Sequence, residues 1–387
     1  MADELKSSLE GVLVAESSLS YIDGDEGRLC YRGYDIDDLA RNASFEEVLY
    51  LLWHGELPDA RELEAFESAM ADERRLDDCV HRVVRDLAEA DEEPMAALRS
   101  IVSTLSAYDP DADAGTGAND DADADADDET ADVRKGRRIT AKMPTALAAF
   151  TRIRDGDDPV APRSNLGHAA NFLYMLNGEV PDDVLAETFD TALVLHADHG
   201  LNASTFSATV TASTLADLHS AVTAAVGTLS GSLHGGANQD VMEMLKEVDA
   251  SEKDALEWVR DALTESRRVP GFGHRVYDVK DPRARILGER SKALGEAGEM
   301  KWYDYSTTIE EYLVEEKGLA PNVDFYSAST YYQMDIPVDI YTPIFAMSRA
   351  GGWVAHVLEQ YTDNRLIRPR SRYVGPTDRS VPPLEDR

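Results

Sequence analysis

The amino-acid sequence predicts a mainly α-helical protein that begins with a short β-hairpin. Two apolar-alternating pieces, VLVAESSLSYI and RLCY, flank Asp23-Gly24 and Gly27, which is typical of strands joined by a tight turn. Beyond this hairpin, apolar residues recur with helical spacing almost everywhere. No βαβ alternation, GxGxxG motif or P-loop occurs, so nothing in the sequence indicates a nucleotide-binding fold.

Local capping signals support the helical prediction. Ser44 with Glu47 forms a capping box in front of an apolar stripe, and Gly55 is expected to end that helix. Ser251 with Asp254 indicates the start of another helix, whose apolar residues share one face.

Two stretches have unusual compositions. Residues 203–229 are mostly Ala, Ser, Thr, Gly and Val, which let helices approach closely, so they form either part of a subunit interface or an ordinary buried helix. Residues 109–132 are dominated by Asp and have no apolar period, so we expect a disordered, solvated loop there. A calcium site in this loop is disfavoured, because EF-hand spacing with a terminal Glu is absent.

The charge balance limits the possible partners. The 387 residues include 38 basic and 74 acidic side chains, a formal net charge of −36, and the basic ones are 29 Arg and 9 Lys. Such a surface repels nucleic acid and anionic membranes, so neither is an expected partner. It also repels itself, and near 1 M salt the Debye length falls to about 3 Å. We therefore expect a protein of a very salty cytoplasm; the alternative is an ordinary acidic enzyme.

Cysteine content and hydropathy indicate a soluble cytoplasmic protein. The two cysteines, Cys30 and Cys79, provide neither a disulfide framework nor a thiolate metal site. The N-terminal MADELKSSLEG lacks an apolar signal core, and no run approaches 18 apolar residues.

Four short segments carry side chains suited to catalysis. His199 ends HADH, His234 lies among glycines in GSLHGGAN, and His274 follows two glycines in PGFGHRVY. Arg283 follows His274 with a fork suited to a carboxylate, and Asp324 lies in a mostly apolar run, where burial would raise its pKa toward that of a general base. Each also has an ordinary structural explanation: a core histidine, a helix-breaking turn, or a capping or salt-bridged Asp.

The HADH segment also suggests a metal site, because histidines three residues apart can share a helix face. However, His196 continues the apolar stripe of its helix, as a buried core histidine would. A metal-dependent hydrolase built on His196 and His199 would need a third ligand, so we expect no metal.

The order of the segments resembles the citrate synthase family. The resemblance rests on LHADHGLNAST, GSLHGGAN, VPGFGHRVY with DPRA, NVDFYS and FAMSRAGGWVAHVLEQ, preceded by GRLCYRGYDIDDLA, SFEEVLYLLWHGELP, PMAALRS and AKMPT. It covers almost the whole chain apart from the acidic stretch. It implies a large helical domain over 1–235 and 327–387 and a smaller, mobile helical domain over 236–326. It also implies that two copies of the chain form a homodimer.

The resemblance implies a role for each member of a catalytic trio. Asp324 would remove a proton from the methyl group of acetyl-CoA, while His234 hydrogen-bonds the thioester oxygen. His274 would polarise and protonate the keto carbonyl of oxaloacetate, and hydrolysis would release citrate and CoA. The substrates would be acetyl-CoA and oxaloacetate, with no cofactor.

The resemblance also implies the substrate-binding residues. Oxaloacetate would be bound by His199, Arg283, Arg349 and Arg368, with Arg368 coming from the other subunit. The CoA moiety would face the loop of Gly271 and Gly273, together with Lys280.

The sequence departs from the family pattern at a few positions outside the trio. Gly200 replaces a frequent Glu, Asp278 stands where a basic residue near the CoA phosphates is common, Glu93 replaces a usual His, and Ala328 replaces a common Gly. Two other functions remain possible from the residues: a 2-methylcitrate synthase that uses propionyl-CoA, and a non-catalytic binding protein of the same fold.

Overall fold

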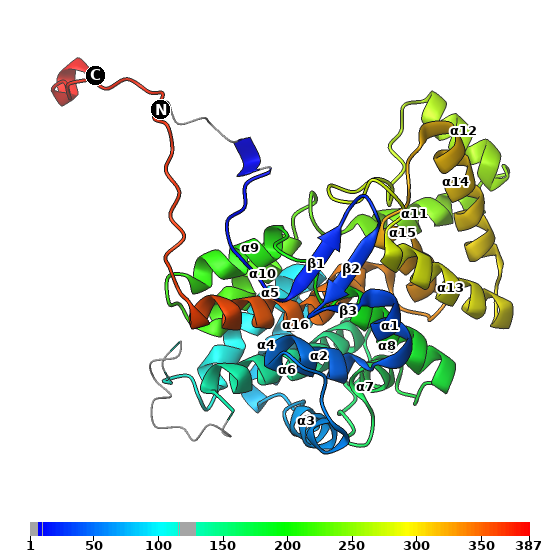
Figure 1. The fold of residues 1–387 in the computed structure, drawn as a ribbon, viewed down its shortest axis with the longest axis horizontal. Coiled ribbons are helices and arrows are strands. Elements are labelled where there is room, and N and C mark those ends of the chain that lie inside the picture. The colour runs from blue at the N-terminus through cyan, green and yellow to red at the C-terminus, as the bar shows by residue number, and fades with distance from the viewer. Residues whose placement is uncertain (1–6, 10, 115, 117–128) are drawn as a thin grey trace.

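The computed structural model describes residues 7–9, 11–114, 116 and 129–387, and this part of the chain is mainly helical, as predicted (Figure 1). The first eight α-helices are α1 (Ile36–Asn42), α2 (Phe45–His54), α3 (Ala60–Asp72), α4 (Asp78–Glu89), α5 (Pro94–Leu105), α6 (Ala131–Arg154), α7 (His168–Asn177) and α8 (Asp183–His196). The later α-helices are α9 (Ala203–Ala212), α10 (Leu218–Leu229), α11 (Ala237–Ala250), α12 (Ala255–Thr264), α13 (Pro282–Ala297), α14 (Lys301–Lys317), α15 (Val323–Tyr332) and α16 (Tyr341–Thr362). Four short 3₁₀ helices are η1 (Ser7–Leu9), η2 (Ser106–Tyr108), η3 (Val338–Ile340) and η4 (Leu384–Asp386).

The predicted N-terminal hairpin is confirmed. Strands β1 (Ser20–Asp23) and β2 (Arg28–Tyr31) pair antiparallel, with Ser20 opposite Tyr31 and Asp23 opposite Arg28. The first strand is shorter than the apolar alternation suggested. A third strand that the sequence did not indicate, β3 (Tyr34–Asp35), pairs with the end of β2.

The helix caps agree with the prediction in one case and differ in the other. Ser44 and Glu47 form the expected capping box of α2, and Gly55 ends that helix with φ +96°. Ser251, however, ends α11, and Asp254 alone caps α12 by accepting a hydrogen bond from the Glu257 N–H. Ser251 and Asp254 lie in the same short connection, and each serves a different helix.

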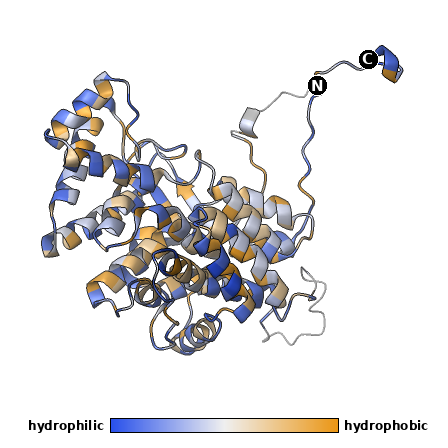
Figure 2. Ribbon diagram, turned by 180° about the vertical axis from the view of Figure 1, so that it is seen from behind, coloured by the Kyte–Doolittle hydropathy of each residue, from blue (hydrophilic) through white to orange (hydrophobic). Residues whose placement is uncertain are grey.

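The hydrophobic core lies along α6 and α16. Nearly the whole length of α16 is buried, and α6, α9, α10 and α2 pack against it. The helices on the outside of the molecule are banded with hydrophilic and hydrophobic residues, so that each turns an apolar side inward (Figure 2). The small-residue stretch 203–229 forms the adjacent pair α9 and α10. Whether that pair faces a second subunit stays a prediction.

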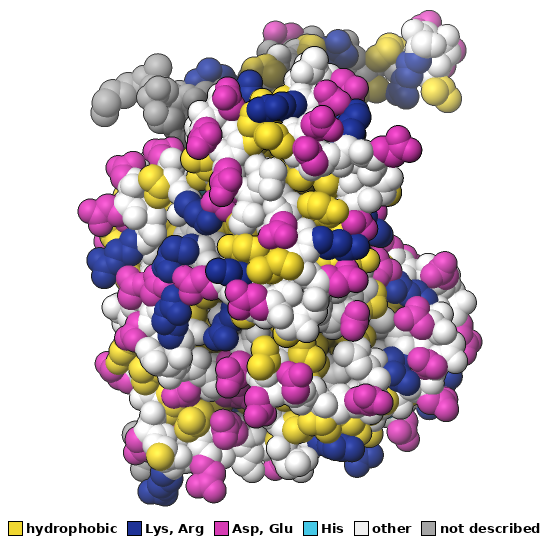
Figure 3. Space-filling view, turned by 90° about the vertical axis from the view of Figure 1, so that its right-hand side faces the viewer, with side chains coloured by type: hydrophobic (Ala, Val, Ile, Leu, Met, Phe, Trp, Pro, Cys, Tyr) yellow, Lys and Arg dark blue, Asp and Glu magenta, His cyan; other side chains and the backbone are white. Residues whose placement is uncertain are grey.

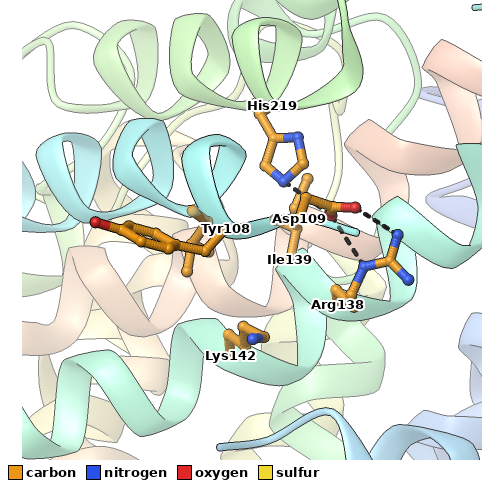
Figure 4. A pocket seen from close by; sticks show the side chains of 7 residues that line it. Tyr108, Asp109, Arg138, Ile139, Lys142 and His219 are labelled. Atoms are coloured by element: carbon orange, nitrogen blue, oxygen red, sulfur yellow. Dashed lines mark hydrogen bonds and ion pairs between the residues drawn. The ribbon is translucent and has the colours of Figure 1, made fainter. Parts of the chain in front are cut away.

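The predicted acidic loop falls largely on residues 115 and 117–128, which lie outside the described residues. Its described ends differ from a solvated loop. Asp109 is 9% exposed and binds Arg138 and His219 (Figure 4), with a distance of 2.6 Å from its Oδ1 to the Arg138 Nη2. Helix α6 begins at Ala131, before the predicted end of the loop. Burial of complementary charges therefore ties the Asp109 end of this stretch to the helical body.

The helices α11 to α15 gather on one side of the molecule, at the upper right of Figure 1. Helix α15 packs against α13 and α11, and α12 against α14. The expected start of a smaller domain at residue 236 coincides with the N-cap of α11, whereas the expected end at residue 326 lies inside α15. Among the described residues, no helix is both long enough and apolar enough to cross a membrane.

Candidate active site

Loops and helix ends bring most of the predicted residues to one region between the helical body and α11–α15. His199 lies between α8 and α9, His234 between α10 and α11, and His274 in the loop before α13. Arg283 and Asp324 lie in the first turns of α13 and α15, and Arg349 lies within α16. The His199 and His274 rings lie 5.3 Å apart between centroids, and the charges of Arg283 and Arg349 act on the pKa of Asp324.

The His234 imidazole is held in one tautomer. Its Nε2 accepts the backbone N–H of Ser204 at 3.1 Å and lies 2.8 Å from the Ser204 hydroxyl. That hydroxyl in turn accepts the indole N–H of Trp353 at 3.1 Å. Burial, with the charge of Arg349, lowers the pKa of His234 to about 4. The neutral ring therefore carries its hydrogen on Nδ1 and can donate it to a ligand.

The His274 imidazole is held in the opposite tautomer. Its Nδ1 accepts the backbone N–H groups of Val276 at 3.0 Å and Tyr277 at 3.2 Å. Burial and the charge of Arg283 lower the pKa of His274 to about 4. Its hydrogen is consequently on Nε2, which is the atom left to donate.

Asp324 has the character of a general base. Asn322 caps α15 by accepting the Asp324 backbone N–H at 3.1 Å, while in the described part of the chain no donor meets the Asp324 carboxylate. Burial raises the pKa of Asp324 to about 6, although the charges of Arg283 and Arg349 oppose it. A carboxylate with this pKa is ionised at neutral pH yet basic enough to accept a proton from carbon.

Two buried arginines make the site attractive to an anion. Arg349 is 1% exposed; its Nε donates to the His196 carbonyl at 2.6 Å, and its Nη2 is buried with no partner among the described residues. Arg283 pairs with Asp281 through both Nε, at 3.0 Å, and Nη2, at 2.7 Å. Burial lowers the pKa of Arg349 to about 10, so it remains charged at neutral pH. An unpaired buried guanidinium N–H is costly unless a ligand accepts from it.

His199 lies against the His274 ring, with 5.3 Å between the ring centroids, and its Nε2 is 3.2 Å from the Tyr277 hydroxyl. Burial, followed by the charges of Arg283 and His274, holds the pKa of His199 well below its usual range. His199 is therefore a neutral ring at the same site.

Arg368 is the predicted residue that one chain does not bring to the site. It is exposed in the extended tail that follows α16 and runs away from the helical body (Figure 1). Its role in a partner's site stays a prediction.

The residues expected to face CoA lie beside Asp324. Gly271 and Gly273 both have φ near +80°, and their carbonyl oxygens accept hydrogen bonds from the backbone and side chain of Asn322, respectively. Lys280 instead pairs with Glu310, 2.5 Å from Nζ to Oε1. Their role toward CoA stays a prediction.

The two histidines of HADH have different surroundings. His196 donates through Nδ1 to the Ala192 carbonyl at 2.7 Å and packs edge-on against Phe345. It belongs to the core, whereas His199 faces His274 and Tyr277. In the described residues, no group of three or more His, Cys, Asp and Glu is arranged to hold a metal ion.

Sequence reasoning missed the residues that orient the site. Ser204 and Trp353 support His234, Tyr277 contacts both His199 and His274, and Asp281 pairs with Arg283. All four lie within the motifs already singled out, but their function depends on contacts across the fold. Only their proximity to the named residues could have suggested them.

A helical fold whose site combines a free carboxylate, two neutral imidazole donors and two buried arginines has the components of an enzyme that removes a proton from carbon beside a bound anion. A family model described as "Citrate synthase, C-terminal domain" matches residues 8–370. The chain belongs to the citrate synthase family.

Individual relatives agree with this assignment. The chain is 68% identical to the citrate synthase of Haloferax volcanii over 100% of both chains. It is 39% identical to a 2-methylcitrate synthase of Mycobacterium tuberculosis, covering 98% of this chain and 93% of the relative.

Solved structures agree as well. The citrate synthase of Pyrobaculum aerophilum has a TM-score of 0.89 at 42% identity, covering 98% of this chain and 94% of that one. The citrate synthase of Thermoplasma acidophilum was solved as a ternary complex with carboxymethyl coenzyme A and oxaloacetate. It has a TM-score of 0.88 at 31% identity, covering 99% of this chain and 100% of that one.

Proposed function

We propose that the chain condenses acetyl-CoA with oxaloacetate and water to give citrate and CoA, using Asp324, His234 and His274. The observation that carries the proposal is the contrast in the trio: Asp324 has a carboxylate without a donor, and each histidine has one nitrogen occupied by backbone N–H groups. The base and both hydrogen donors are thus prepared before substrate binds.

In the first step Asp324 takes a proton from the acetyl methyl group. The electron pair of the broken C–H bond moves into the thioester, and the His234 Nδ1–H hydrogen-bonds the oxygen where negative charge develops. A base and an electrophile that act on the same substrate contribute roughly 10²–10⁴-fold each. His234 suits this role because its low pKa keeps the ring a neutral donor.

In the second step the enol carbon attacks the keto carbon of oxaloacetate. The His274 Nε2–H passes to the carbonyl oxygen, which becomes the hydroxyl of the product. His274 regains a proton from water, and Asp324 releases the proton that it took from carbon. Water then cleaves the thioester and releases CoA. Every step is a proton transfer or the making or breaking of a carbon–carbon or thioester bond, so the scheme calls for no metal or redox cofactor.

The anion-binding residues select a keto acid with two carboxylates. The free Nη2 of Arg349 and the guanidinium of Arg283 supply charge and orientation, and His199 supplies a neutral contact. We propose that Arg368 of a partner subunit completes this set in a homodimer. Gly271, Gly273 and Lys280 would contact CoA, with Lys280 exchanging Glu310 for a phosphate.

We also propose that the protein works in a salty cytoplasm. The net charge of −36 supports this, as does the spread of acidic side chains over the face drawn in Figure 3. The relative from Haloferax volcanii comes from a halophile.

Thiol release from acetyl-CoA in the presence of oxaloacetate tests the proposed reaction. The unaltered protein should release CoA only with both substrates present, and Asp324→Asn should lose about 10²–10⁴-fold in kcat. Asp304→Asn, an exposed carboxylate in the first turn of α14, is the matched control and should keep full activity. Unchanged condensation by Asp324→Asn would refute the assignment of the base.

The acyl group is tested with the same assay. Comparing kcat/KM for acetyl-CoA and propionyl-CoA measures a discrimination of about 1–3 kcal/mol for one methyl group. We expect acetyl-CoA to be preferred. A preference for propionyl-CoA would make the chain a 2-methylcitrate synthase.

A further inference from the structure

The tip of the N-terminal hairpin touches the loop that carries His274. The Gly24 carbonyl, in the turn between β1 and β2, accepts the backbone N–H of Asp278 at 3.0 Å. Figure 1 shows the hairpin extending from the helical body toward the side formed by α11–α15. Two residues 254 positions apart in sequence, Gly24 and Asp278, are thereby joined through their backbones.

This contact leaves no room for a side chain at residue 24. A Cβ on Gly24 would lie 1.9 Å from the Val276 carbonyl oxygen and 2.9 Å from its carbon. The φ of Gly24 lies outside the left-handed region, so the backbone itself does not require glycine. Contact with the His274 loop is therefore what restricts this position.

A second glycine of the same turn, Gly27, also lies against this loop, although its φ of +65° favours glycine in any case. A Cβ on Gly27 would lie 2.7 Å from Val279 Cγ2 and 3.3 Å from the Lys280 carbonyl oxygen. The turn thus lies along the His274 loop from Val276 to Lys280.

The stretch that touches Gly24 also orients His274. The Val276 N–H donates to His274 Nδ1, while the Val276 carbonyl lies against Gly24. The next residue, Tyr277, donates its N–H to the same Nδ1 and contacts His199 through its hydroxyl. A shift of Val276 would therefore be transmitted to the imidazole through one peptide unit.

Hydrogen bonds hold the hairpin in place at both of its ends. Asp23 Oδ1 accepts the N–H groups of Asp25 at 3.1 Å and Glu26 at 2.9 Å, which fixes the turn. At the other end, the buried Tyr31 hydroxyl donates to the Asp198 carbonyl at 2.8 Å, and the Ser20 hydroxyl bonds the Asp198 carboxylate. Asp198 directly precedes His199, so the hairpin is attached to one histidine loop and abuts the other.

We infer that the hairpin tip is a positioning element for the condensation: Gly24 seats the His274 loop so that the Nε2–H of His274 meets the keto carbonyl. This inference rests on the proposed role of His274. Relieving a 1.9 Å approach to a normal contact requires movement of more than 1 Å, and a misplacement of about 1 Å can cost about 10²-fold in rate.

The test compares Gly24→Ala and Gly24→Val with Asp25→Ala, a change on the same turn at an exposed side chain. Condensation is followed by thiol release. Enolisation alone is followed by deuterium uptake into the acetyl-CoA methyl group in D₂O with L-malate, which has both carboxylates of oxaloacetate but no keto carbonyl. Thermal unfolding in the same KCl buffer monitors the fold.

We expect kcat for condensation to fall about 10²-fold in Gly24→Val and less in Gly24→Ala. Deuterium uptake and KM for acetyl-CoA should stay within about twofold of the unaltered protein, because in the described part of the chain no hydrogen bond or ion pair joins the hairpin to Asp324 or His234. Asp25→Ala should keep full activity. A purely structural role for Gly24 would not separate the two reactions in this way.

Several results would overturn the inference. Condensation by Gly24→Val within twofold of the unaltered protein would do so, as would an equal loss of condensation and deuterium uptake in a folded variant. If Gly24→Val does not fold, the same criteria apply to Gly24→Ala. His274→Asn is measured alongside: normal condensation by that variant removes the proposed role of His274 itself, whereas a strong loss there with normal Gly24 variants overturns the hairpin inference alone.

Discussion

Asp324 and the two catalytic-site histidines owe their properties to what surrounds each side chain. The carboxylate is buried without a donor, which raises its pKa to about 6, and the imidazoles are buried beside arginines, which lowers their pKa values to about 4. At neutral pH all three are therefore in the state that the proposed chemistry needs. The acid, base and donor roles are separated by environment, not by residue type alone.

The pH dependence of kcat/KM for acetyl-CoA should reveal the Asp324 base. Below about pH 6 the carboxylate is protonated, and kcat/KM should fall tenfold for each further pH unit. The histidines remain neutral down to about pH 4, so they should not contribute to this limb. Initial rates between pH 4.5 and 8 at fixed KCl should show this limb as a fall of roughly thirtyfold. A limb near pH 4 would contradict a raised pKa.

Asp324→Asn should also change stability. The folded protein holds the Asp324 proton up to about pH 6, whereas an unfolded chain releases it near pH 4, so ionisation of this group destabilises the fold as pH rises through that window. At pH 8 the Tm of Asp324→Asn should exceed that of the unaltered protein by about 1–3 °C. The gap should close below about pH 4. An equal or lower Tm at pH 8 would count against burial as the cause.

At the scale of elements, loops and helix ends position the side chains of the proposed active site. The first turn of α9 orients His234 through Ser204, and the first turn of α15 carries Asp324. The end of η2 is tied in another way: Asp109, just after that helix, binds Arg138 of α6 and His219 of α10 (Figure 4). This buried cluster closes the base of the acidic segment.

Breaking that cluster should destabilise the protein. Burial alone would raise the pKa of Asp109, but the hydrogen bonds from His219 and Arg138 outweigh it and hold the pKa well below its usual range. Stability from this carboxylate is therefore present above about pH 4 and is lost as pH falls through the lower, folded-state pKa. Asp109→Asn should lower the free energy of unfolding by up to about 3 kcal/mol at pH 7, because it leaves Arg138 partly unpaired.

Denaturant unfolding at fixed KCl measures this loss. Asp113→Asn, an exposed neighbour in the same segment, is the control and should change stability by less than about 0.5 kcal/mol. Equal effects of the two substitutions would mean that the buried cluster contributes nothing.

At the scale of the whole molecule, two features concern the surroundings of the chain. They are the extended tail with Arg368, which we relate to a second subunit, and the excess of acidic charge, which we relate to salt. The tail leaves the body after α16 (Figure 1), and Arg368 is exposed within it. A homodimer in which the tail crosses to a partner would give Arg368 its proposed role.

Hybrid dimers test the tail directly. Asp324→Asn and Arg368→Gln chains, co-expressed with different affinity tags and purified through both, give one chain of each kind per dimer. If Arg368 serves the partner's site, one site receives both defects and the other none, so about half of the unaltered activity should return. If Arg368 serves its own site, each site has one defect and activity should stay as low as in the parent variants.

Salt dependence tests the proposed environment. Repulsion among the surplus acidic side chains destabilises the fold until salt screens it, so Tm should rise with KCl, by about 10 °C or more between 0.2 M and 3 M. Sucrose at matched osmolality is the control, because it adds no screening. Full stability in dilute buffer would contradict adaptation to high salt.

The sequence by itself determined the helical class, the hairpin, the family and the residue types of the site, because these depend on local periodicity and on motifs in a recognisable order. Only the tertiary structure decided the state of each group: which nitrogen of His234 and of His274 carries the hydrogen, that Asp324 has no donor, and that Arg349 keeps a free Nη2. It also decided that Gly24 meets Val276 and that Ser251 ends one helix while Asp254 begins the next. Tautomers, burial and close approaches arise between segments far apart in the chain, so no local pattern records them.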